Sequence, residues 1–245
     1  MKKAVVLLSG GLDSATTLYY AKDKGFQCFC LIFDYGQRHG KEINAARKIA
    51  QKANAQSQIV KITLPWKGSS LLDKRMPVSS IQNHCLPAGQ AGSNAIPPTY
   101  VPARNIIFLS FALSCAEVIR AKAIFIGANA IDYSGYPDCR PRFYQAFIKA
   151  AQLGTKAGVE GNPVKIVAPL IKKTKAQIIK LGMKLGAPYE LTWSCYKGGR
   201  APCGECDSCE FRAKGFYEAG LADPLIKRLE ARDYKFGVIR DDRKS

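Results

Sequence analysis

The stretch AVVLLSGGLDSATTLYYA, residues 4–21, decides the fold of this chain. An apolar run over residues 4–8 leads directly into Ser9, Gly10 and Gly11, and a helical pattern starts near Asp13. A short apolar run bounded by glycines is typical of a buried strand, and a glycine turn that joins such a strand to a helix is typical of parallel α/β proteins. The stretch therefore predicts a strand, a tight turn and a helix at the edge of a sheet where ligands bind.

Strand and helix patterns alternate along the rest of the chain. We expect strands at residues 3–9, 27–35, 58–64, 124–128 and 164–170, and helices at residues 13–25, 41–54, 104–123 and 174–186. Thr174 and Gln177 predict a capping box at the start of the last helix. The alternation predicts an α/β fold, with a parallel sheet, right-handed crossovers and flanking helices.

Two parts of the chain depart from this alternation. Residues 65–100 have no clean period and are rich in Pro, Gly, Ser and Asn, and a loop of this length often has a function, such as a lid. After the last expected helix come four clustered cysteines and a charged tail. We therefore expect an α/β domain over residues 1–190 and a small metal-binding segment with a tail over residues 191–245.

Composition limits the class of protein. The chain has 245 residues, 47% of them hydrophobic, which is typical of a globular protein. The apolar run near the N-terminus is too short for a secretion signal, and no run is long enough to span a membrane, so we expect a cytoplasmic protein. The net charge of +18 favours anionic partners, but the basic residues are spread along the chain. A solvated basic surface is therefore favoured over a dedicated RNA-binding patch.

The turn over residues 9–14, here called the glycine loop, predicts a phosphate site. Gly10 and Gly11 let a ligand approach the backbone, and Ser9 and Ser14 add hydroxyl groups beside a helix N-terminus whose N–H groups attract phosphate. The string matches neither the Walker A pattern nor Gly-x-Gly-x-x-Gly. Asp13 either caps the helix or helps to hold Mg²⁺, and the alternative interpretation is a tight turn with Asp13 as an ordinary N-cap.

Three further strings fall where such a sheet holds its ligand: DYGQRH at residues 34–39, TYVPARN at 99–105 and IDYSGYPDCR at 131–140. An aspartate can accept hydrogen bonds from a guanine-like ring, a tyrosine can stack on it, and Arg140 can pair with a carboxylate. The alternative interpretation of the third string is a turn whose tyrosines pack on the core. Beside a phosphate loop, the ligand-binding interpretation is favoured.

The glycine loop resembles the PP-loop of the ATP pyrophosphatases. Together with the three strings, Lys175 and the cysteines, it resembles the 7-cyano-7-deazaguanine synthase family from residue 9 to residue 209. The resemblance implies that ATP activates the carboxylate of 7-carboxy-7-deazaguanine as an adenylate, that ammonia gives the amide, and that a second activation gives the nitrile. It also implies Mg²⁺, a homodimer, and neither a stable nucleic-acid partner nor a membrane.

The resemblance assigns roles residue by residue. The ATP site is expected at Leu8, Ser9, Gly10, Gly11, Leu12, Asp13, Ser14, Ala15, Thr16, Thr17 and Leu18; catalysis at Asp13, Arg104, Lys175 and Asp138; and the substrate at Asp132, Tyr136, Asp138 and Arg140. His39 is more often structural than catalytic in such a setting, and a packed thiol is favoured over a nucleophile for Cys139. Pro98 and Arg142 depart from the family pattern, which leaves Asp138 and Arg140 undisturbed.

Four cysteines, Cys195, Cys203, Cys206 and Cys209, predict a metal site. Four thiolates in a short Gly-containing loop suit tetrahedral Zn²⁺ in a structural role. An iron–sulfur cluster uses similar spacing and is the alternative, and the family resemblance favours zinc. Two rival functions stay open: a PP-loop enzyme that modifies tRNA, and a zinc-ribbon protein that binds nucleic acid. The first leaves the Ser-Gly-Tyr-Pro string unexplained, and the second leaves the glycine loop without a purpose.

Overall fold

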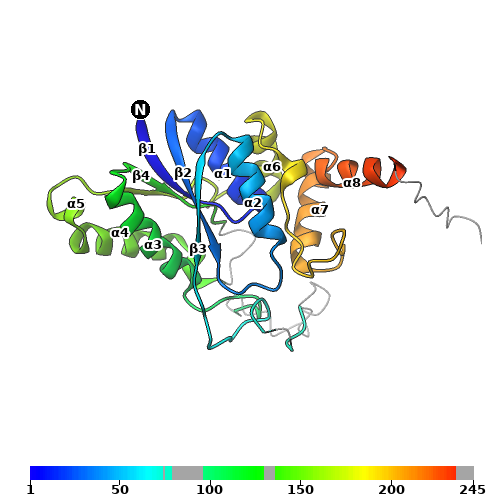
Figure 1. Ribbon diagram of the computed structural model, residues 1–245, viewed down its shortest axis with the longest axis horizontal. Helices are drawn as coiled ribbons and strands as arrows, with labels where there is room; N and C mark the ends of the chain where they lie inside the picture. The colour runs from blue at the N-terminus through cyan, green and yellow to red at the C-terminus, as the bar shows by residue number, and fades with distance from the viewer. Residues whose placement is uncertain (74, 79–95, 130–135, 236–245) are drawn as a thin grey trace, which may run out of the picture.

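The computed structural model describes residues 1–73, 75–78, 96–129 and 136–235. Its centre is a five-stranded parallel sheet in the order β3-β2-β1-β4-β5 (Figure 1). The strands are β1 (Lys2–Leu7), β2 (Phe26–Asp34), β3 (Gln56–Lys61), β4 (Ala123–Phe125) and β5 (Lys165–Val167). The expected parallel sheet with flanking helices is therefore confirmed. Asp132 and most of the expected lid, residues 79–95, lie outside the described residues.

Helices cover both faces of the sheet. They are α1 (Leu12–Asp23), α2 (Lys41–Lys52), α3 (Arg104–Val118), α4 (Pro141–Gly154), α5 (Lys156–Val159), α6 (Lys175–Lys184), α7 (Asp207–Ala219) and α8 (Pro224–Lys235), with short 3-10 turns η2 (Pro137–Cys139) and η3 (Tyr189–Leu191). In Figure 1, α3, α4 and α5 lie on one side of the strands, and α1, α2 and α6 lie on the other, with α7 and α8 beyond them. The capping box expected at α6 is present.

The central strand β1 supplies both cores through alternation of its side chains. Val5 and Leu7 pack with Leu109 of α3, whereas Ala4 and Val6 pack with the helices α1 and α2. All four of these strand residues are buried. Lys2 and Lys3 at its start are exposed, but residues 4–7 are covered on both faces. This part of β1 is therefore a continuous apolar run, which is the usual appearance of a buried parallel strand.

The helix expected over residues 104–123 is too long. It ends at Val118, and Arg120 then takes a left-handed backbone conformation with φ of 56°. The N–H of Ala121 donates to the carbonyl oxygen of Ala116 at 2.8 Å, which closes the helix end and turns the chain into β4. An arginine in a left-handed conformation cannot be recognised from the sequence. The apolar pattern therefore predicted a helix that continues beyond its observed end.

Four helices were not expected: α4, α5, α7 and α8. The helix α7 begins at its N-cap Cys206, within the cysteine-rich segment, and packs against α6, where Gly215 lies on the Lys175 side chain. A Cβ at Gly215 would lie 2.3 Å from Lys175 Cγ, so this glycine permits the two helices to meet. No helix in the described ranges is long and apolar enough to cross a membrane.

Candidate active site

A cavity of about 240 Å³ opens where β1, β2 and β4 end. Its wall includes the glycine loop, the loop after β2, the start of α3, the segment 126–129 after β4, the first residue of α6, and residues of α7. Gly127 packs on the backbone of Asp13 and Ser14, where a Cβ would lie 3.0 Å from Ser14 N. The cavity therefore lies at the point where the sheet order changes direction between β1 and β4, which is where open α/β sheets bind ligands.

The two glycines of the loop have different reasons to be glycine. Gly10 has a φ of 88°, and a Cβ there would lie 2.2 Å from the carbonyl oxygen of Glu42. It therefore lets the loop sit directly against α2. Gly11 has an ordinary φ of −78° and lines the cavity, where the nearest atom to an added Cβ is Ser9 Oγ at 3.5 Å. Its missing side chain leaves the start of α1 open to a ligand.

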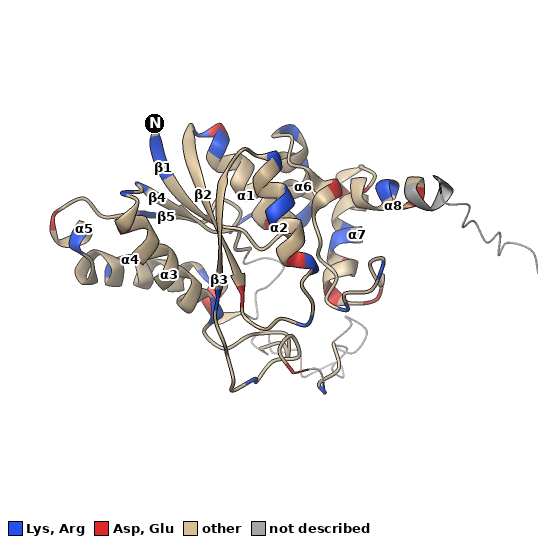
Figure 2. Cartoon of the chain, in the orientation of Figure 1, with Lys and Arg blue, Asp and Glu red and all other residues tan. Residues whose placement is uncertain are grey.

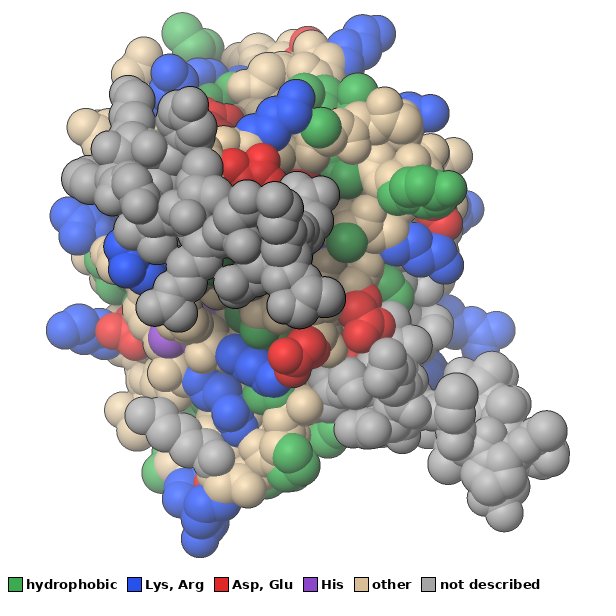
Figure 3. Space-filling view, turned by 90° about the vertical axis from the view of Figure 1, so that its right-hand side faces the viewer, with side chains coloured by type: hydrophobic (Ala, Val, Ile, Leu, Met, Phe, Trp, Pro, Cys, Tyr) green, Lys and Arg blue, Asp and Glu red, His purple; other side chains and the backbone are tan. Residues whose placement is uncertain are grey.

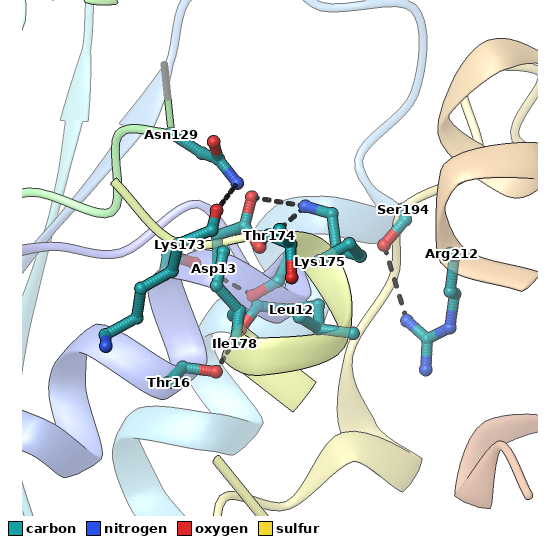
Figure 4. A network of polar contacts seen from close by, with 12 residues as sticks. Leu12, Asp13, Thr16, Asn129, Lys173, Thr174, Lys175, Ile178, Ser194 and Arg212 are labelled. Atoms are coloured by element: carbon teal, nitrogen blue, oxygen red, sulfur yellow. Dashed lines mark hydrogen bonds and ion pairs between the residues drawn. The ribbon is translucent and has the colours of Figure 1, made fainter. Parts of the chain in front are cut away.

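Asp13 is not the N-cap of α1. That position belongs to Gly11, which has no side chain to accept from the first turn, so the interpretation of Asp13 as an ordinary cap is wrong. The Asp13 carboxylate instead accepts from Lys175 Nζ through both oxygens, at 2.8 and 2.9 Å (Figure 4). Asp13 and Lys175 are 162 positions apart, and both line the cavity. The structure thus unites two of the predicted catalytic residues at the glycine loop.

The predicted ATP-binding residues divide into two groups. Leu8, Ser9, Gly11, Leu12, Asp13 and Ser14 line the cavity. Gly10, Ala15, Thr16, Thr17 and Leu18 are buried and do not line it. The hydroxyl groups of Thr16 and Thr17 donate to the carbonyl oxygens of Leu12 and Asp13 at 2.9 Å, so they brace the first turn of α1 from the core.

Arg104 is the first residue of α3 and lines the cavity. Its Nη1 donates to the Tyr35 hydroxyl at 3.4 Å. Glu42, in the first turn of α2, lines the same cavity, and burial raises its pKa to about 7 despite the opposing effect of Arg104. Sequence reasoning missed Glu42, because a glutamate in the first turn of a polar helix looks like ordinary dipole compensation.

The substrate string contributes less directly than expected. Tyr136 lines the cavity, and its hydroxyl lies 2.6 Å from Thr99 Oγ1. Asp138 is buried, does not line the cavity, and accepts from the backbone N–H of Asn105 through Oδ2 at 3.0 Å. Burial raises the pKa of Asp138. Arg140 is the N-cap of α4, is exposed and does not line the cavity.

Cys139 lies beside Asp138 and does line the cavity. Its thiol accepts from Asn105 Nδ2 at 3.3 Å, and burial raises its pKa to about 12. A thiol that stays protonated at neutral pH is a poor nucleophile. The packed-thiol interpretation is therefore favoured by its surroundings.

The DYGQRH string builds the neighbouring wall. Arg38 donates to the carbonyl oxygens of Ser70 at 2.6 Å and Asp73 at 3.0 Å, and also to that of Met76. His39 Nε2 lies 2.9 Å from the carbonyl oxygen of Cys195, which requires the proton on Nε2. Burial lowers the pKa of His39. Arg38 thus ties down the start of the expected lid, and His39 ties the strand-β2 loop to the cysteine segment.

The four cysteines converge as predicted. The sulfur atoms of Cys195, Cys203, Cys206 and Cys209 all lie within 4.8 Å of one another, and those of Cys203 and Cys209 are 3.9 Å apart. A hydrogen bond from the Cys209 thiol lowers the pKa of Cys206 to about 5. Thiolate is the form that binds metal, so this cysteine cluster is chemically able to hold an ion.

Trp193 connects the cysteine cluster to the glycine loop. Its backbone N–H donates to the carbonyl oxygen of Gly10 at 2.9 Å, and its indole Nε1 donates to that of Cys195 at 3.0 Å. Arg212 of α7 adds a second tie: its guanidinium pairs with Asp223 and donates to Thr192 Oγ1 at 2.8 Å. Figure 4 shows Arg212 turned toward Ser194, which lies in the loop after η3.

Charge outside the cavity is dispersed. Figure 2 shows Lys and Arg on most helices, and in Figure 3 they are spread over the visible face without forming one patch. On this face, the Lys and Arg side chains that are drawn in colour form no continuous basic strip.

A family model and the curated relatives agree on one family. The family model described as queuosine biosynthesis protein QueC matches residues 3–220. A 7-cyano-7-deazaguanine synthase from Trichodesmium erythraeum is 52% identical over 226 residues, covering 91% of this chain and 100% of the relative. One from Thermoplasma volcanium is 54% identical over 224 residues, covering 91% and 90%. Among solved structures, NMN synthetase from Francisella tularensis is 15% identical with a TM-score of 0.47, covering 100% of this chain and 87% of that chain.

Proposed function

This chain belongs to the queuosine biosynthesis protein QueC family, and from that membership we propose that it uses ATP and ammonia to convert 7-carboxy-7-deazaguanine into 7-cyano-7-deazaguanine. It is an ATP-dependent ligase that forms carbon–nitrogen bonds. One structural observation carries the proposal: the glycine loop, the paired Asp13 and Lys175, and Arg104 all line a single cavity at the sheet edge.

The glycine loop is the proposed site for the phosphates of ATP. Gly11 leaves the N-terminus of α1 uncovered, where N–H groups and the helix dipole attract anions. Lys175 and Arg104 supply positive charge from two other helices. Together these groups stabilise the charge that develops as the substrate carboxylate attacks the α-phosphate and pyrophosphate leaves.

Asp13 is the residue that would hold Mg²⁺. Its two oxygens are hard donors at the cavity wall, which suits this ion, and Mg²⁺ takes few protein ligands beside the phosphates it binds. The ion would neutralise phosphate charge. Both Asp13 oxygens accept from Lys175, which holds the carboxylate in place. Each oxygen has a second lone pair, so Asp13 could hold the ion while Lys175 stays bound.

The substrate end of the cavity is proposed at Tyr136, Asn105 and Cys139. Asp138 Oδ2 is committed to the N–H of Asn105, the second residue of α3. We therefore propose that Asp138 serves the substrate by fixing the start of α3, which carries Arg104 and Asn105 into the cavity.

Zinc is the proposed metal of the cysteine cluster. A Zn–S bond of about 2.3 Å in a tetrahedron places sulfur atoms roughly 3.8 Å apart, which agrees with the 3.9 Å between Cys203 and Cys209. Four thiolates would close the coordination shell. The metal would therefore hold its segment in place and have no bound water for catalysis.

Family membership also supports a homodimer that works in the cytoplasm. Light scattering of the purified protein tests the dimer, and a mass equal to one chain would contradict it.

Product analysis tests the proposed function. The protein is incubated with ATP, Mg²⁺, ammonium and either 7-carboxy-7-deazaguanine or bulk tRNA, and the products are identified by mass spectrometry. The proposal expects the nitrile and AMP in the first mixture only. A modified nucleoside in the tRNA, without the nitrile, would establish the rival activity instead.

A further inference from the structure

We propose that Glu42 is the general base that takes the proton from ammonium during carbon–nitrogen bond formation. The inference rests on the proposed function, because that reaction needs an unprotonated nitrogen nucleophile. Ammonium is the predominant form of ammonia at neutral pH and has no lone pair. A group within the cavity that accepts its proton would let the reaction use this predominant form rather than the small fraction of free ammonia.

Glu42 is the carboxylate in the right place. Among the described residues that line the cavity, only Asp13 and Glu42 carry carboxylates. Lys175 binds both oxygens of Asp13. Within the same described set, no hydrogen bond or ion pair engages the Glu42 side chain, so its oxygens stay available to a small cation.

The fold fixes Glu42 beside the glycine loop. A Cβ on Gly10 would lie only 2.2 Å from the backbone carbonyl oxygen of Glu42, so the start of α2 contacts the loop directly. Glu42 and Gly11 line the same cavity, so the Glu42 side chain shares that cavity with the proposed site of the adenylated carboxylate. Arg104 from α3 and Tyr35 from the end of β2 are the charged and titratable groups that act on it.

His39 is a weaker candidate for this role. Its Nε2 is engaged with the carbonyl oxygen of Cys195, and its Nδ1 is shut away from solvent. The remaining charged groups at the cavity are cations that cannot act as bases while charged, namely Arg38, Arg104, Lys175 and Arg212. Burial has raised the pKa of Glu42 to about 7, so this carboxylate can both accept and release a proton near neutrality.

The proposed step balances as follows. Glu42 accepts one proton from ammonium, which frees the nitrogen lone pair. Nitrogen then attacks the acyl carbon, the C–N bond forms, and the bond from that carbon to the AMP oxygen breaks with its electron pair leaving on AMP. Glu42 releases its proton to solvent, and the second proton lost by nitrogen follows, which yields the neutral amide.

Glu42→Gln separates this step from the one before it. The variant should still form the adenylate, measured as substrate-dependent exchange of labelled pyrophosphate into ATP, because that step needs no ammonia. Amide formation from ammonium should fall by about 10²-fold or more. Its remaining rate should rise with pH in proportion to free ammonia, whereas the wild-type rate should level off once Glu42 is ionised. Glu218→Gln, an exposed change on α7, is the matched control.

A second experiment replaces ammonium with hydroxylamine, which is mostly unprotonated at neutral pH and needs no base to become a nucleophile. With hydroxylamine the variant should form the hydroxamate at close to the wild-type rate. Equal loss of pyrophosphate exchange and of hydroxamate formation, especially if excess Mg²⁺ restores both, would overturn the proposal and place Glu42 at the ATP site. An unimpaired reaction with ammonium would overturn it as well. Wild-type protein without substrate-dependent exchange would refute the proposed function itself.

Discussion

The pair of Asp13 and Lys175 shows how two charges from distant parts of the chain make one site. Their side chains are 18% and 10% exposed, so water screens the pair only partly. Asp13 holds the Lys175 ammonium group in position beside the glycine loop before an anion binds there. The carboxylate positions the lysine, and we propose that it also faces the phosphates of ATP.

Asp13→Asn should abolish most ATP-dependent turnover, with kcat/KM falling by at least about 10²-fold, because the variant loses a charge at the phosphates. The lost charge-assisted hydrogen bonds should cost ~2 kcal/mol of stability. Steady-state kinetics and chemical denaturation measure the two effects. Asp23→Asn, at the exposed end of the same helix, should change neither. Normal turnover in Asp13→Asn would remove the glycine loop from the ATP site.

Glu42 makes the stability of the protein depend on pH. Its pKa is about 7 in the folded state against an ordinary 4.5, so the folded protein binds the proton more tightly. The resulting stabilisation is fully present below about pH 4.5 and is lost as the pH rises through about 7. Glu42→Gln removes this loss. Relative to wild type, the free energy of unfolding of the variant should rise by at most about 3 kcal/mol between about pH 4.5 and pH 7. Above that range the difference should stay constant.

Urea unfolding at a pH of about 5 and a pH of about 8 measures this gain, with Glu218→Gln as the control. A gain that is the same at both values would mean that Glu42 ionises normally in the folded protein.

At the scale of elements, the glycine loop packs so closely against α2 that there is no room for one added methyl group. Gly10→Ala should destabilise the protein by about 2–3 kcal/mol, because its φ of 88° disfavours alanine and the added Cβ meets a backbone oxygen. Gly11→Ala is the matched change. It should leave stability within about 0.5 kcal/mol, because the atom nearest to the new methyl group would be Ser9 Oγ at an ordinary 3.5 Å. It should still weaken ATP binding, because Gly11 lines the cavity.

Thermal unfolding and calorimetric titration with ATP compare these two variants. Equal losses of stability in both would show that the close approach of the loop to α2 does not distinguish the glycines.

Sequence patterns predicted those elements whose signals are local. The apolar run at β1, the glycine turn and the Thr174 capping box each depend on a few neighbouring residues. All three are present in the structure. The end of α3 was missed because Arg120 adopts a left-handed conformation that its type does not announce. The helix α7 was missed because Gly215 interrupts its helical sequence pattern. A glycine is needed there because the Lys175 side chain lies where a Cβ would be.

Site residues followed the same division at the scale of the whole molecule. The glycine loop and the cysteine cluster are local motifs and were found. Glu42, Trp193 and Arg212 owe their places to contacts across the fold, and no spacing rule brings them together. Asp138 was predicted to contact the substrate ring, whereas its Oδ2 accepts from the N–H of Asn105, a contact that depends on how η2 meets α3.

At the scale of the whole molecule, Trp193 joins the cysteine cluster to the glycine loop. Its backbone N–H holds Gly10, and its indole holds Cys195. His39 holds the same Cys195 carbonyl from the loop after β2. A change at the metal should therefore reach the glycine loop, although no metal ligand lines the cavity among the described residues.

Cys206→Ser tests this connection. Losing one thiolate should lower metal content and stability together, since binding energy at such sites is folding energy. ATP affinity per folded molecule should fall as well, because the segment that fixes Gly10 loosens. Elemental analysis, thermal unfolding and calorimetry measure the three quantities, and Cys115→Ser, on α3 outside the cluster, should leave all three unchanged. A metal-depleted variant that folds and binds ATP normally would contradict the connection, and iron with visible absorption in the wild type would contradict zinc.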